Sequence, residues 1–114
     1  MSASQGSALN AVAFQLAATL ESYEEDVGRL MRSPLEPDLY RRVSRHVDLM
    51  RMYAASFPSL SVAWIEVLIR HFELTHGLWR EQSGQPAELE ARLLHLRAAI
   101  ARLRMLCLRV VASS

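Results

Sequence analysis

The 114-residue chain has no lysine, a single cysteine and only four glycines. One cysteine, Cys107, excludes a disulfide within the chain. Four glycines leave little material for a phosphate-binding loop, and the sequence contains no Gly-x-Ser-x-Gly or paired-cysteine metal motif. We therefore expect a protein that is not an enzyme and that holds no cofactor.

Long apolar runs are also missing. None exceeds four residues, whereas a helix that spans a bilayer needs roughly 20. All of the 13 basic residues are arginine, as in proteins from GC-rich bacterial genomes, and 12 carboxylates reduce the net charge to +1. This balance gives no overall attraction to nucleic acid or membranes. Together these features predict a soluble cytoplasmic protein, and the arginine usage favours a bacterial source.

Apolar residues make up 51% of the chain and recur with helical spacing in four segments. The spacing predicts helices over about 8–32, 37–57, 61–82 and 86–111, which prolines at 34, 37, 58 and 86 separate. Residues 1–7 are small and polar, so we expect a flexible tail, with Ser7 as the N-cap of the first helix. Residues 8–114 are then one all-α domain, an antiparallel (up-down-up-down) four-helix bundle.

The last predicted helix carries two apolar stripes on opposite sides. The first, with large side chains, suits the bundle core: Leu89, Leu93, Leu96, Ile100, Leu103, Cys107 and Val110. The second is rich in alanine: Ala87, Ala91, Leu94, Ala98, Ala101, Met105, Leu108 and Ala112. A bundle helix needs only one apolar stripe, so the second needs its own cover. We predict a homodimer interface formed by Leu94, Ala98, Ala101, Met105 and Leu108. There are two alternatives to this interface. The alanines are exposed and simply favour helix formation, or the third helix of the same chain covers the second stripe.

The predicted helix over 61–82 also has an apolar arc wider than one stripe. Exposed aromatic side chains often dominate binding energy, so we predict partner contact through Trp64, Leu68 and Trp79. Packing of the same residues in the core is the alternative. His71 lies in this arc, which predicts a partly buried, hydrogen-bonded histidine.

Acidic residues gather in the second half of the first helix, at Glu21, Glu24, Glu25 and Asp26. We expect a solvated face that an up-down bundle places opposite the arginines of the last helix.

These features favour a small protein-interaction module, an adaptor, chaperone or regulatory accessory protein that acts as a homodimer. One alternative is a nucleic-acid-binding regulator that contacts phosphates through Arg41, Arg42 and Arg45. Another is a metal-binding bundle, because Glu73 and His76 have the Glu-x-x-His spacing of di-iron bundles. That site needs a second such motif, which the sequence lacks, so we predict no metal site.

Overall fold

The computed structural model describes residues 2–80 and 86–113, and within these it consists of helices without strands. Four α-helices follow in order: α1 (Ser2–Arg32), α2 (Pro37–Ala54), α3 (Ser61–Arg80) and α4 (Pro86–Ala112). A short 3₁₀-helix, η1 (Pro58–Leu60), joins α2 to α3. The predicted all-α four-helix bundle is confirmed.

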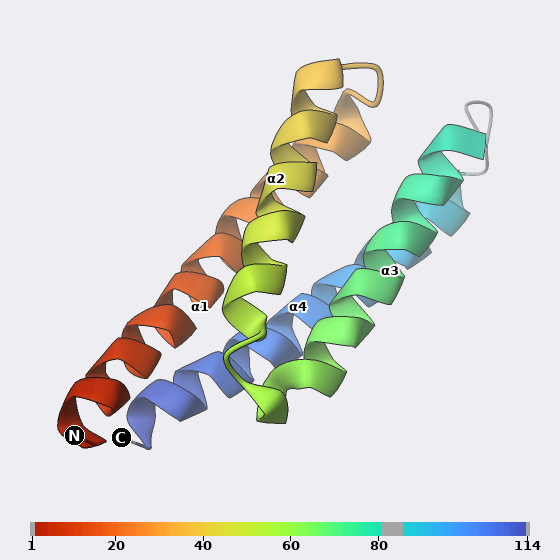
Figure 1. The fold of residues 1–114 in the computed structure, drawn as a ribbon. Helices are drawn as coiled ribbons and strands as arrows, with labels where there is room; N and C mark the ends of the chain where they lie inside the picture. Colours follow the sequence, from red (N-terminus) through yellow and green to blue (C-terminus); the bar gives the residue numbers. More distant parts are fainter. Residues whose placement is uncertain (1, 81–85, 114) are drawn as a thin grey trace.

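The helices run alternately up and down, so the two ends of the chain lie at the same end of the molecule (Figure 1). α1 packs against both α2 and α4, and α4 packs in turn against α3. Among helices that follow one another in the chain, contact is weakest between α2 and α3, and Figure 1 shows these two helices diverging away from the α2–α3 connection. The bundle is elongated, with principal extents of 56 × 24 × 17 Å.

Two helix boundaries differ from the prediction. α1 begins at Ser2 instead of Ala8, so the predicted tail from Ser2 onward is helical and Ser7 is not an N-cap. α2 ends at Ala54 instead of Phe57, because a residue that precedes proline disfavours the helical conformation. Phe57 is accordingly extended, at φ −129° and ψ 90°, and Pro58 starts η1.

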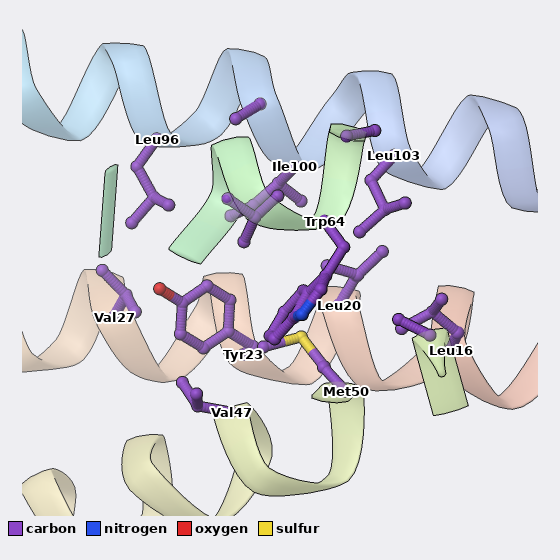
Figure 2. Packing of buried hydrophobic residues seen from close by; sticks show 14 of the residues in the cluster. Leu16, Leu20, Tyr23, Val27, Val47, Met50, Trp64, Leu96, Ile100 and Leu103 are labelled. Atoms are coloured by element: carbon purple, nitrogen blue, oxygen red, sulfur yellow. The ribbon is translucent and has the colours of Figure 1, made fainter. Parts of the chain in front are cut away.

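The core contains the predicted large-side-chain stripe of α4 together with apolar side chains from the other three helices. Figure 2 shows side chains from every helix meeting in one cluster, with the indole of Trp64 directed toward Leu20 and Met50. The side chains with at most 1% exposure include Leu16, Leu20, Tyr23, Leu30, Met50, Val67, Leu74, Leu96, Ile100, Leu103 and Cys107. Burial of this much apolar surface is the main source of stability in a bundle whose loops are short.

Gly77 lies inside α3 at a point where α3 and α4 approach each other closely. A Cβ atom there would collide with the guanidinium of Arg92 and lie 3.2 Å from Cδ2 of Leu89. The glycine therefore gives α4 room to pack closely against this end of α3. None of the helices in the described ranges is long and apolar enough to cross a bilayer.

Candidate protein-interaction faces

The second stripe of α4 points away from the core along the length of the helix. Its large side chains are strongly exposed: Leu94 by 64%, Met105 by 45% and Leu108 by 46%. Ala98 and Ala101 between them are exposed as well. We call Leu94, Ala98, Ala101, Met105 and Leu108 the α4 outer face. No other helix of the described chain covers this face, which removes the alternative that α3 does so.

The two flanks of the α4 outer face differ in charge pairing. On the flank beside α1, Arg97 lies 3.7 Å from Glu24 and Arg104 lies 3.1 Å from Glu21. These contacts confirm that the acidic segment of α1 faces arginines of α4. On the other flank Arg102 and Arg109 are exposed, and neither forms an ion pair with a described residue. The outer face is therefore apolar along its middle, with paired arginines on one flank and unpaired arginines on the other.

The aromatic residues predicted to contact a partner do not form an exposed group. Trp64 is only 8% exposed and packs in the core, because the turn of α3 that carries it faces α1 and α2. The prediction of partner contact through Trp64 is therefore wrong, and its core-packing alternative is right. Leu68 is half-buried against the core, and the side chain of Trp79 lies outside the described residues.

Instead, a different set of apolar side chains is exposed on α3. Val62, Ile65, Ile69 and Phe72 are each at least 47% exposed and lie on one side of the helix. We call these four residues the α3 outer face. Their spacing of three, four and three residues was visible in the sequence, but the apolar arc of α3 is so wide that the spacing alone could not separate core from surface.

His71 and Tyr23 form a buried pair between α3 and α1. The Tyr23 hydroxyl lies 2.7 Å from Nδ1 of His71, and the two rings are tilted by 50°. Burial lowers the pKa of His71 from 6.5 to about 4, so at pH 7 the imidazole is neutral and its Nδ1 accepts a hydrogen bond from the Tyr23 hydroxyl. Burial likewise raises the pKa of Tyr23. The predicted hydrogen-bonded histidine is confirmed, and its role here is to fix α3 against α1.

Asp26 is buried, at 3% exposure, although the sequence placed it on a solvated face. Its Oδ1 accepts a hydrogen bond from Arg42 at 3.1 Å, and its Oδ2 lies 2.9 Å from Nε2 of His46. Nδ1 of His46 is buried without a hydrogen-bond partner in the described chain. The expectation failed because α2 closes over this part of α1, which helical spacing within α1 cannot reveal. The cluster fixes α1 against α2.

The three arginines considered for nucleic-acid contact are not equally available. Arg42 bonds to Asp26, and Arg41 pairs with Asp38 on its own helix. Arg45 has no carboxylate partner among the described residues, and it lines the same shallow polar pocket as His46. Two of the three charges are therefore already compensated within the chain.

Glu73 and His76 do not meet at a metal site. Glu73 accepts a hydrogen bond from Arg70 at 3.0 Å, on the exposed side of α3. Among the described residues, no group of three or more His, Cys, Asp or Glu side chains could hold a metal ion. Cys107 lies in the core, and burial raises the pKa of its thiol to about 11. This thiol is therefore protonated at neutral pH, and the thiolate is the form that reacts.

Comparison with protein-family models, with curated proteins and with solved structures found no match to this chain.

Proposed function

We propose that this protein is a non-enzymatic interaction module that works as a homodimer, with the α4 outer face as the contact between the two copies. An adaptor, a chaperone or a regulatory accessory protein requires only such contact surfaces. The use of arginine for all 13 basic residues favours a bacterial source, and a chain with a single cysteine suits the reducing cytoplasm.

The observation that carries the proposal is the exposure of Leu94, Met105 and Leu108 on one side of one helix. Single exposed apolar residues are common on soluble proteins, but an aligned row of them marks a contact surface. Ala98 and Ala101 sit at the centre of this row, where their small side chains allow another helix to approach closely.

The α3 outer face supports the second part of the proposal, contact with a different protein. It offers Phe72 and three aliphatic side chains over about three helical turns. Such a strip suits an amphipathic helix of a partner, which inserts apolar residues at intervals of three and four. It lies on α3, so the partner would bind outside the self-contact on α4.

The nucleic-acid alternative has less support. A phosphate-binding face needs arginines that are free to neutralise phosphate charge. Ion pairs with Asp26 and Asp38 occupy Arg42 and Arg41.

The experiment replaces two apolar side chains of the α4 outer face by charged ones, with the double substitution Met105→Glu and Leu108→Arg. Since both side chains are exposed in the single chain, the variant should fold with unchanged helicity by circular dichroism. Light scattering should then give the mass of one chain for the variant and of two chains for the parent protein.

A matched control carries Ile65→Glu and Phe72→Arg on the α3 outer face, where both side chains are equally exposed. This control should remain a dimer. If the α4 variant keeps the mass of the parent, the α4 outer face is not the contact. If it loses its helicity, those residues stabilise the single chain and the proposal fails.

A further inference from the structure

We infer that the two copies meet with their α4 helices antiparallel, crossing where Ala98 of one copy lies against Ala101 of the other. This inference rests on the proposed homodimer and specifies its geometry. It follows from how charge and side-chain size are distributed along the exposed side of α4.

The charges of α4 that have no ion-pair partner in the described chain change sign along the helix. Glu88 pairs with Arg92, Arg97 with Glu24 and Arg104 with Glu21. The exposed Glu90 lies in the first two turns, whereas the exposed Arg102 and Arg109 lie in the second half, and none of these three forms an ion pair with a described residue. An antiparallel pair places the acidic end of each helix beside the basic end of the other. A parallel pair places the arginines of both copies side by side, where like charges repel.

The helix dipoles favour the same orientation. The positive N-terminal end of one helix lies beside the negative C-terminal end of its neighbour only when the two are antiparallel. In each copy this interaction acts at the two ends of α4, Pro86–Ala112, where the partial charges of the dipole lie. Dipole and side-chain charge therefore act in the same sense.

Side-chain sizes fit a two-fold axis between positions 98 and 101. This axis pairs Leu94 of one copy with Met105 of the other, and Ala91 with Leu108. Large side chains then meet on both sides of a central alanine crossing. Every apolar residue of the α4 outer face gains a partner, so no large side chain stays exposed at one end.

The contact is not confined to α4. Phe14 of α1 is 61% exposed and lies two helical turns before Glu21, the residue that pairs with Arg104. Stable interfaces bury roughly 800 Å² on each partner, more than one row of a single helix supplies. Side chains of α1 beside the C-terminal half of α4 supply additional apolar area.

Disulfide trapping between variants that each add one exposed cysteine to the buried Cys107 tests the orientation. Leu94→Cys and Met105→Cys chains are prepared separately, one of them with an affinity tag, and oxidised alone and as a mixture. In the antiparallel pair, position 94 of one copy is about 16 Å along the axis from position 94 of the other, too far for a disulfide. The same holds for position 105, whereas positions 94 and 105 face each other.

We therefore expect a covalent dimer from the mixture, in at least tenfold greater yield than from either chain alone. The parent chain, with only the buried Cys107, and an Ile69→Cys chain on the α3 outer face serve as controls that should stay unlinked. Efficient linkage within each single variant would show a parallel pair and overturn the inference, while the proposed dimer would stand. A parent protein with the mass of one chain would refute the dimer and the inference together. A dimer by mass that no variant traps would place the contact elsewhere and overturn both.

Discussion

The two sides of α4 share one apolar spacing and have opposite surroundings. On the core side, Leu96, Ile100, Leu103 and Cys107 are at most 1% exposed, because α1 and α3 pack against them. On the outer side, Leu94, Met105 and Leu108 remain about half exposed. Spacing therefore shows that a helix face is apolar, but not what covers it. The cover must be found in the tertiary structure, or in a second molecule.

The largest difference between these sides should appear in the stability of the single chain. Leu103→Ala removes a fully buried side chain and should lower the free energy of unfolding by about 2–5 kcal/mol. Leu108→Ala removes an exposed one and should change it by about 0.5 kcal/mol or less when measured at a dilution where light scattering gives the mass of one chain. Urea unfolding followed by circular dichroism gives both values. Equal losses would show that the outer face is part of the core.

Acid should weaken the packing of α3 against α1, where His71 is buried, and leave the α4 outer face unaffected. The pKa of His71 is 6.5 when unfolded and about 4 when folded, so the unfolded chain binds more protons between these pH values. The contribution of neutral His71 to the free energy of unfolding is complete above about pH 6.5 and falls as the pH drops toward 4. The loss is on the order of 3 kcal/mol, and urea unfolding at several pH values measures it.

A His71→Gln chain is the control, since glutamine still accepts a hydrogen bond from the Tyr23 hydroxyl. Its unfolding free energy should depend less steeply on pH in this range. Identical pH dependence in the two proteins would contradict the assignment of His71 as a buried neutral group.

Thiol chemistry distinguishes the two sides of α4. Cys107 on the core side has a pKa of about 11, whereas a cysteine introduced by Ala101→Cys on the outer face of the monomeric Met105→Glu, Leu108→Arg variant should have an ordinary pKa near 8.5. At pH 8 the introduced thiol should react with a disulfide reagent on the order of 100-fold faster, because the thiolate is the reactive form. The reaction is followed spectroscopically under native conditions with Cys107 alone as the reference. Comparable rates would mean that the core side opens readily.

The ion pair between Glu21 and Arg104, on the flank between the two sides of α4, should contribute least to the free energy of unfolding. Glu21→Gln removes the partner of Arg104, but the side chains of Arg104 and Glu21 are 42% and 60% exposed. An exposed ion pair of this kind is worth about 0.5 kcal/mol or less, and salt weakens it further. The change in unfolding free energy should therefore be small at low salt and vanish at high salt. A loss above about 1 kcal/mol would show that this pair is more shielded than its exposure indicates.

Helical spacing predicted the four helices and both stripes of α4, because the residues that determine them lie a few positions apart. It also placed the acidic segment of α1 opposite arginines of α4, since an up-down bundle fixes which helices are neighbours. Helical spacing could not predict the burial of Asp26, because its partners Arg42 and His46 come from another helix. Trp64 could not be assigned either, because apolar residues surround most of α3 and any of several sides could face the core.

The mass of the unmodified protein in solution tests the central claim most directly. Light scattering over a dilution series should give twice the 12.9 kDa of one chain at high concentration, with dissociation on dilution into one-chain species. A mass of 12.9 kDa at every concentration would show that no second copy covers the α4 outer face, and would contradict the account.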